Sequence, residues 1–129
     1  MTWREELLAL RDQGFDVLDW ISARDDGEVT IVACLVRSDD PSQIRLVHSP
    51  APVVSVADLF PSAAWHERET AEMFGVDFGV VAEPLLLPAA SPPVLRKQTP
   101  LPARLHEWPG AVDPAKPLRR QDPPGTPWT

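Results

Sequence analysis

Proline divides this chain into two unequal parts, and no other feature limits its folding so strongly. Four of its 16 prolines lie at positions 41, 50, 52 and 61, and the other twelve follow residue 79. Because proline lacks a backbone N–H and favours extended conformations, it interrupts helices and central strands. The sequence therefore predicts a globular domain over residues 1–79 and an extended, proline-rich tail over residues 80–129 that becomes ordered on partner subunits.

Charge and cysteine content exclude several classes of protein. Residues 1–78 carry fifteen acidic and six basic side chains, whereas nucleic acid requires a concentrated basic face. Cys34 is the only cysteine, so neither an intrachain disulfide nor a cysteine-ligated zinc or iron–sulfur site can form. The N-terminus is charged, unlike a signal peptide, and the apolar runs are far shorter than the roughly 20 residues that span a bilayer.

The first 50 residues predict one helix followed by strands. Thr2 and Glu5 have the spacing of a capping box, and Gly14 supplies the end of that helix. The turn Asp25-Asp26-Gly27 separates two runs rich in β-formers and indicates a hairpin. We expect strands over residues 15–23, 28–37 and 43–50. The second strand is apolar on both faces, which predicts a central strand covered on both sides.

Two further helices are expected after the strands. Ser55 and Ser62 are suited to N-cap positions, and Pro61 separates the two segments that they precede. The predicted fold class is therefore α+β: an N-terminal helix, an antiparallel sheet of three or more strands, two C-terminal helices packed on the sheet, and an extended tail.

The helix after Ser62 has an unusual distribution of side chains. At 100° per residue, Trp65, Glu69 and Glu72 cluster beside Arg68, whereas Glu67 falls in the middle of the opposite, apolar arc. Arg68 is placed to contact the Trp65 ring and to pair with Glu72 at i,i+4. This pattern favours a helix covered on both faces, by its own sheet and by a partner. We expect its buried carboxylates to find counter-groups on the neighbouring polypeptide.

An ordinary solvated helix face with local ion pairs is the main alternative to docking, and three other functions also compete with it. His66-Glu67 resembles the start of a zinc-protease helix, but that motif requires a second histidine where Thr70 stands. A free-standing enzyme using Glu67, Glu69 and Glu72 would need at least two of these carboxylates in one pocket. A proline-rich adaptor is the third alternative, because residues 114–119 have the spacing of an SH3 ligand.

One stretch resembles a known family, the C-type or 30-kDa-type subunit of proton-pumping NADH–quinone oxidoreductase (respiratory complex I). The family's signature runs Glu-Arg-Glu, two variable residues, an acidic residue, two apolar residues, Gly, an aliphatic residue, any residue and Phe. Residues 67–78, ERETAEMFGVDF, fill every constrained position. Ser55-Val56 and Trp65 before this stretch, and Leu95-Arg96-Lys97 after it, also resemble the family. The order of elements over residues 1–79 is similar to the family's order.

The resemblance implies a structural subunit without catalysis of its own, in the peripheral arm of an assembly that couples electron transfer from NADH to quinone to ion translocation. NADH, flavin, iron–sulfur clusters and quinone would be bound by partners, with no catalytic, cofactor-binding or metal-ligating residue in this chain. The implied partners are the D-type and B-type subunits, at the cytoplasmic face of the bacterial cell membrane, with membrane contact only through the complex. The equivalent subunit of a membrane-bound nickel–iron hydrogenase is the alternative. The implied interface and signature residues are Trp65, Glu67, Arg68, Glu69, Glu72, Met73, Phe74, Gly75, Phe78, Leu95, Arg96 and Lys97.

Overall fold

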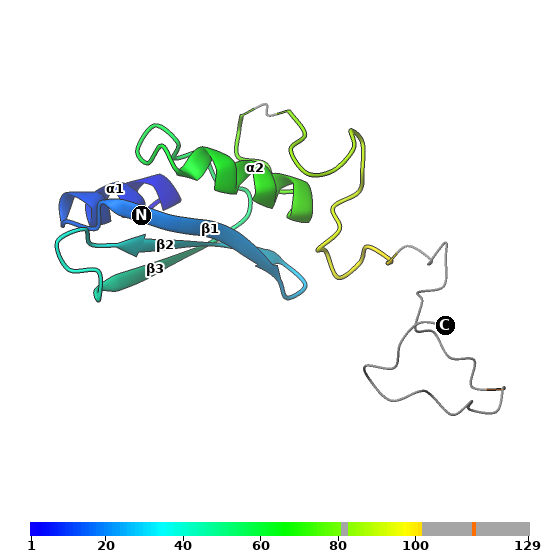
Figure 1. Cartoon of the computed structure of the whole chain (residues 1–129), viewed down its shortest axis with the longest axis horizontal. Helices are drawn as coiled ribbons and strands as arrows, with labels where there is room; N and C mark the ends of the chain where they lie inside the picture. Colours follow the sequence, from blue (N-terminus) through cyan, green and yellow to red (C-terminus); the bar gives the residue numbers. More distant parts are fainter. Residues whose placement is uncertain (81–82, 102–114, 116–129) are drawn as a thin grey trace, which may run out of the picture.

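The described part of the chain folds into a three-stranded sheet with two helices (Figure 1). The computed structural model describes residues 1–80, 83–101 and 115. In the described residues the elements follow the order α1 (Trp3–Asp12), β1 (Val17–Asp25), β2 (Val29–Val36), β3 (Ile44–Pro50) and α2 (Ala63–Phe74). The predicted α+β class is confirmed. No helix in the described ranges combines the length and apolar character needed to cross a membrane.

Helix α1 forms for the local reasons that its sequence predicts. The Thr2 side chain accepts a hydrogen bond from the Glu5 backbone N–H, and the Glu5 carboxylate accepts one from the Thr2 N–H, so the capping box is complete. Trp3 and Leu7 are the buried residues of the helix. Gly14, with φ of +104°, follows the last turn in a conformation that favours glycine.

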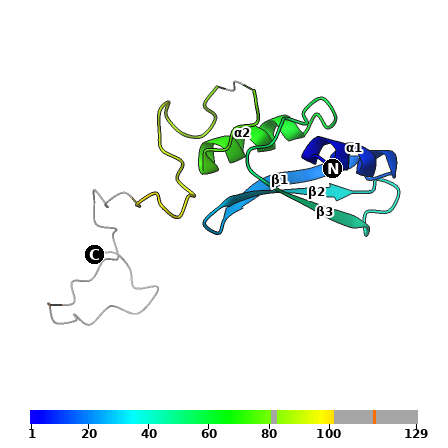
Figure 2. The ribbon, with the colours of Figure 1, turned by 180° about the vertical axis from the view of Figure 1, so that it is seen from behind.

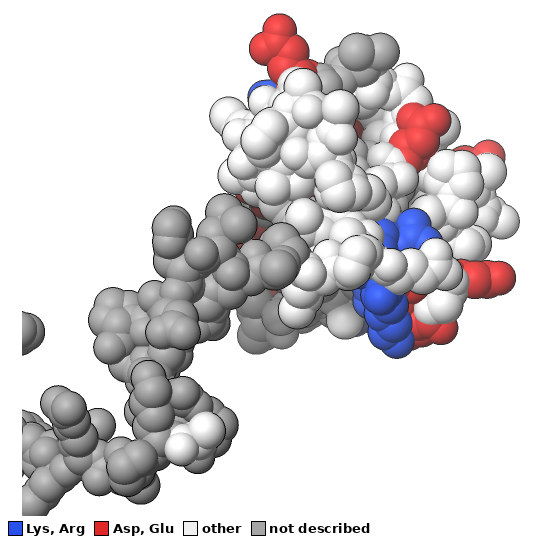
Figure 3. Space-filling view, turned by 90° about the vertical axis from the view of Figure 1, so that its right-hand side faces the viewer, with Lys and Arg blue, Asp and Glu red and all other residues white. Residues whose placement is uncertain are grey.

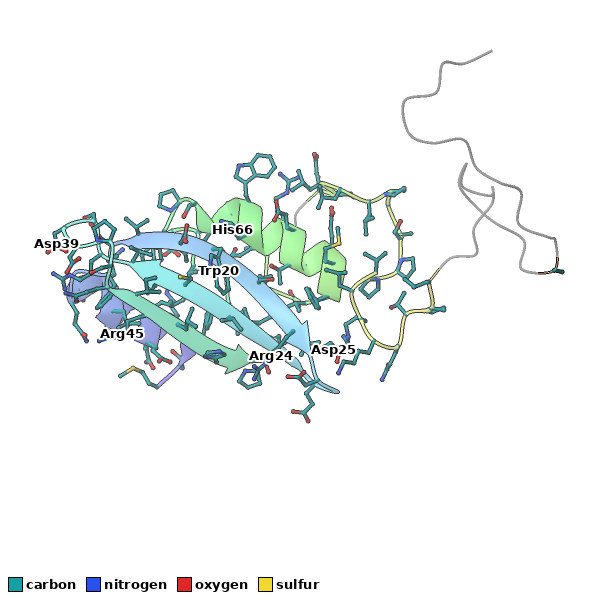
Figure 4. All side chains as sticks on the ribbon, turned by 60° about the horizontal axis from the view of Figure 1, so that its bottom comes forward. Trp20, Arg24, Asp25, Asp39, Arg45 and His66 are labelled. Atoms are coloured by element: carbon teal, nitrogen blue, oxygen red, sulfur yellow. The ribbon has the colours of Figure 1, made fainter. Side chains whose placement is uncertain are left out.

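The sheet is antiparallel with the order β1-β2-β3, which confirms the predicted central strand. The hairpin between β1 and β2 turns at Gly27, whose φ is +103° and whose N–H donates to the Asp25 carboxylate at 3.0 Å. Both helices lie on one face of the sheet (Figures 1 and 2), and on the other face Thr30, Val32 and Val36 of β2 are half-buried, so β2 is fully covered on one side only, whereas coverage on both sides was predicted. On the other face, which Figure 4 views, Cys34 is buried between its cross-strand neighbours Trp20 and Leu46.

The core lies between the helices and the sheet. Helix α2 packs along β1, and α1 packs along β3. Strand β2 contributes alternate residues that face the helices, as expected for a period of two. The buried apolar cluster includes Trp3, Leu7, Phe15, Leu18, Ile21, Val29, Ile31, Ala33, Leu35, Val47, Val53, Val56, Phe60, Ala63, Phe74, Val76 and Phe78.

The prediction of two helices after the sheet is wrong for the first of them. Residues 56–60 form a turn in which the Leu59 and Phe60 N–H groups both donate to the Val56 carbonyl. Pro61 follows at once and lacks a donor to extend this turn. Ser62 was also expected to cap α2 with its side chain. Its hydroxyl instead donates to the Leu18 carbonyl at 3.0 Å, which ties the start of α2 to β1.

Candidate interface site

Helix α2 has one face against the sheet and one face toward solvent. Its buried residues are Ala63, Glu67, Thr70 and Phe74. This confirms that a carboxylate lies in the buried stripe. On the opposite side Trp65 is 57% exposed, although tryptophan is a residue that normally buries most of its surface. The unusual distribution of side chains predicted from the sequence is therefore present in the folded chain.

Glu67 is 3% exposed and is bonded to the segment before α2. One carboxylate oxygen accepts from the Ser55 hydroxyl at 2.6 Å, and the other accepts from the Val56 backbone N–H at 2.8 Å. We expected this carboxylate to find its partners on a neighbouring polypeptide. The structure corrects that expectation, because the chain itself supplies two donors at hydrogen-bond distance.

The pair Ser55-Val56 therefore has a structural role that the sequence resemblance alone did not reveal. Ser55 also donates its backbone N–H to the Phe78 carbonyl at 2.8 Å, and its hydroxyl accepts from the Ala57 N–H. Residue 55 thus connects Glu67 in the signature helix with Phe78 at the end of the signature. A buried carboxylate bonded in this way stabilises the fold and fixes the register of α2.

Thr70 stands where a zinc-protease motif would need its second histidine, and its hydroxyl has a structural contact instead. The Thr70 hydroxyl lies 2.7 Å from the His66 carbonyl and 3.4 Å from the Ile21 carbonyl. It therefore bonds to a backbone oxygen of α2 itself and to one of β1 beneath the helix. No group of three or more His, Cys, Asp or Glu side chains in the described part of the chain is placed to hold a metal ion.

Arg68 and Trp65 form the cation–π contact expected from their spacing. The guanidinium carbon lies 5.2 Å from the centre of the Trp65 ring. The expected i,i+4 ion pair between Arg68 and Glu72 is not among the salt bridges of the described residues. Arg68 instead donates to the Glu83 carbonyl at 2.9 Å. Trp65 and Arg68 are residue types that dominate the centres of protein interfaces.

Glu72 is bonded to the chain that follows α2. Its carboxylate accepts from the backbone N–H groups of Leu85, Leu86 and Leu87, the last two at 2.7 and 3.3 Å. These donors, the Leu85 N–H first among them, hold the pKa of Glu72 below its usual value. Glu72, like Glu67, finds its partners within the chain rather than on a neighbour. Glu69 lies on the outer face of the helix, where it is exposed.

The end of the signature closes the helix and the core. Phe74 and Phe78 are buried, and Met73 packs partly against them. Gly75 has φ of +67° and ends α2 by donating its N–H to the Ala71 carbonyl at 2.9 Å. Only glycine adopts this left-handed conformation without steric cost, which explains the glycine at this signature position.

Asp25 is a site residue that sequence reasoning missed. Its carboxylate accepts from Arg96 Nε and from the Lys97 backbone N–H, both at 3.0 Å. The Lys97 and Gly27 N–H groups, with Arg96, hold the pKa of Asp25 below its usual value. The sequence marked Asp25 only as a turn residue. Arg96 and Lys97 lie more than 70 positions away along the chain, so no local pattern links them to Asp25.

The three glutamates of the enzyme alternative do not share one pocket. Glu67 lines a groove of about 230 Å³ beside α2, and Glu72 lines a separate hollow of about 200 Å³ under residues 83–91. Glu69 lines neither of them. The geometric condition for an acid/base pair among these carboxylates is therefore not met in the described residues. Arg68 lies between the two hollows and lines both.

Comparison with known proteins adds to this geometry. The family model described as "Respiratory-chain NADH dehydrogenase, 30 Kd subunit" matches residues 1–105, which includes the sheet, both helices and the segment through Leu101. The match thus includes both residues 1–79 and Leu95-Arg96-Lys97, where the sequence suggested a resemblance. Residues 106–129 lie outside it.

Two curated relatives agree with this family. The chain is 37% identical over 70 residues to the C/D subunit of NADH-quinone oxidoreductase from Acidiphilium cryptum (strain JF-5), over 51% of this chain and 12% of that protein. It is 50% identical over 40 residues to "NADH dehydrogenase [ubiquinone] iron-sulfur protein 3" of Marchantia polymorpha, over 29% of this chain and 20% of that protein. The chain therefore matches only a small part of the length of either relative.

The fold defines an α+β protein in which two helices cover one face of a three-stranded antiparallel sheet. The chain belongs to the family of the 30-kDa subunit of respiratory-chain NADH dehydrogenase.

Proposed function

We propose that this chain is a non-catalytic structural subunit in the peripheral arm of a complex-I-type NADH–quinone oxidoreductase. It packs against the D-type and B-type subunits at the cytoplasmic face of the bacterial cell membrane. The assembly carries electrons from NADH to quinone and couples this transfer to ion translocation. NADH, flavin, iron–sulfur clusters and quinone are bound by the partners.

The observation that carries this proposal is the pair Trp65 and Arg68 on the outer face of α2. Trp65 is more than half exposed, and Arg68 covers part of its ring without a carboxylate partner among the described salt bridges. Beside Arg68 runs the groove lined by Ala64, Ala71 and Val80. Trp65 is joined to this groove through Arg68, which lines it. A large exposed aromatic side chain is costly to leave in water and gains free energy when a partner covers it.

The test is co-purification: the chain carries an affinity tag, and the amount of D-type subunit recovered with it is measured. We expect Trp65→Ala to lower this recovery about tenfold, as for a central interface residue. Val54→Ala is the matched control, because Val54 is a similarly exposed apolar residue that lies outside α2. Equal recovery of the D-type subunit with both variants would contradict the docking role of α2.

Membership of a nickel–iron hydrogenase complex is the alternative assembly. The two assemblies differ in the subunits encoded beside this chain. Flavin-binding and NADH-binding subunits encoded nearby support complex I, whereas a large subunit with two Cys-x-x-Cys nickel motifs supports the hydrogenase. The adaptor alternative rests on residues 114–119, which lie outside the described residues except for Ala115.

A further inference from the structure

The segment after α2 returns to the body of the molecule at two places. We call residues 83–99 the strap. In Figure 1 it runs along the end of α2 and past the β1–β2 hairpin. Figure 3 views this end of the molecule, where uncharged side chains cover most of the described surface. The strap contains Leu95-Arg96-Lys97, which the proposed function leaves without a role.

The first attachment is the Glu72 carboxylate. It accepts from three consecutive backbone N–H groups, those of Leu85, Leu86 and Leu87. One turn earlier on α2, Arg68 donates to the Glu83 carbonyl. Two neighbouring side chains of α2 therefore bond the backbone of the strap. The Leu86 side chain, 56% exposed, is left facing outward.

The second attachment is the Asp25 carboxylate, whose side chain is 4% exposed. Arg96 bridges two elements, because its Nε donates to Asp25 at 3.0 Å and its Nη1 donates to the Phe74 carbonyl at 3.4 Å. The Lys97 N–H also donates to Asp25, and the Leu95 N–H donates to the Met73 carbonyl at 2.9 Å. This attachment joins the strap to the hairpin and to the last turn of α2.

Gly75 allows the strap to approach between these two attachments. A Cβ atom at residue 75 would lie 3.2 Å from Pro93 Cγ, which is closer than ordinary van der Waals contact. Pro93 is held in turn, because its carbonyl accepts from the Thr99 hydroxyl at 2.6 Å. The signature glycine thus serves both the end of α2 and the seat of the strap.

We propose that the chain itself holds the strap in place through Asp25 and Glu72, so that residues 83–99 are folded before any partner binds. Within Leu95-Arg96-Lys97, the arginine side chain is the positioning group. The leucine and lysine side chains are exposed, and their backbone N–H groups make the bonds to the body. This differs from the sequence prediction that the tail becomes ordered only on partners. The difference concerns residues 83–99, and residues 102–114 and 116–129 lie outside the described part.

The experiment is hydrogen exchange of the isolated, full-length chain, followed at the amides of Leu85, Leu86, Leu95 and Lys97. In the wild type we expect these amides to exchange at least about tenfold more slowly than an unstructured chain, because each is held in a hydrogen bond of the folded protein. Exchange at the unstructured rate in the wild type would overturn the proposal.

Matched variants separate the two attachments. Arg96→Gln and Asp25→Asn are expected to speed exchange at Leu95 and Lys97 by about tenfold or more, because a hydrogen bond to a charged group is lost. Lys97→Gln is the control for Arg96→Gln, and Asp26→Asn is the control for Asp25→Asn. For the first attachment, Glu72→Gln should speed exchange at Leu85 and Leu86, and Glu69→Gln is its control. If each control speeds exchange as much as its partner variant, the proposal is wrong.

The amides of β2 serve as an internal reference for global unfolding. If Asp25→Asn speeds their exchange as well, Arg96→Gln decides the outcome, because Arg96 lies outside the sheet. The experiment needs no partner protein. Failure of the strap proposal would therefore leave the proposed function standing, and loss of recovery of the D-type subunit would leave the strap proposal untouched.

Discussion

Helices α1 and α2 cover the same face of one sheet, yet they are held there in different ways. Helix α1 buries Trp3 and Leu7 and keeps its charged residues outside. Helix α2 buries Glu67 and Thr70 and exposes Trp65. The first helix buries only apolar side chains, and its arginines Arg4 and Arg11 bond residues 55–59 from the partly exposed side. The second needs specific donors and acceptors from residues elsewhere in the chain.

This contrast separates residues that maintain the fold from residues available to a partner. On α2 the Glu67 carboxylate and the Thr70 hydroxyl are bonded within the chain, so they have no need of a neighbour. Arg68 Nε, by contrast, is buried without a hydrogen-bond partner among the described residues. What remains for a neighbour is the outer face, with Trp65, Arg68 and Glu69. The interface role of these residues stays a prediction, and the following variants test the contrast from the largest expected effect to the smallest.

Leu7→Ala should give the largest loss of stability. Leu7 is fully buried in the core between α1 and the sheet. Truncation of a buried leucine removes apolar contacts and leaves a cavity, which costs about 2–5 kcal/mol. Chemical denaturation of the isolated chain measures this. Leu8→Ala, at a half-buried position, is the control, and an equal loss in both variants would contradict the apolar basis of α1.

Glu67→Ala should be the most damaging polar substitution on α2. It leaves the Val56 N–H and the Ser55 hydroxyl without their acceptor in a buried site, at a cost of about 1–3 kcal/mol. Glu69→Ala, on the outer face, should stay within about 0.5 kcal/mol of wild type. The midpoints of urea unfolding report both values. If Glu67→Ala leaves the free energy of unfolding unchanged, the buried carboxylate does not stabilise α2, and the contrast with α1 is wrong.

Thr2→Ala should cost about 1 kcal/mol, because it removes the side-chain acceptor of the α1 capping box. Exchange of the Glu5 amide should increase as the first turn frays. Ser62→Ala is the matched variant on α2, where the hydroxyl bonds the Leu18 carbonyl and caps no helix N–H. The first-turn amides of α2 should therefore keep their exchange rates. If Ser62→Ala speeds exchange in the first turn of α2 as much as Thr2→Ala does in α1, Ser62 and Thr2 both cap their helices and the two N-termini are held alike.

Trp65→Ala should have the smallest effect on stability, within about 0.5 kcal/mol, although it removes the largest side chain of α2. The ring lies on the outer face of the helix against Arg68 and is more than half exposed. Thermal unfolding of the isolated chain is the measurement. A loss comparable to that of Leu7→Ala would mean that the ring belongs to the core and not to a docking surface.

The features that depend on neighbouring positions could be predicted from the sequence. The capping box at Thr2, the turn at Gly27 and the central position of β2 follow from local patterns, and the structure confirms them. The turn over residues 56–60 was predicted as a helix, because a single helical turn and a short helix have the same local pattern.

The partners of the buried acids could not be predicted. Ser55 and Glu67 are 12 positions apart, and Asp25 and Arg96 are 71 positions apart. Nothing in a single sequence shows which donor a carboxylate will meet after the chain folds. The sequence identified Glu67 as unusual by its position on the helix, which was correct, but it assigned the missing partners to another polypeptide.

The most direct test of the account is purification of the tagged, full-length chain from its native membranes, with the co-purifying proteins identified by mass. The account predicts that the D-type and B-type subunits of an NADH–quinone oxidoreductase elute with the chain in near-equal amounts. Recovery of the chain without these two subunits would contradict it.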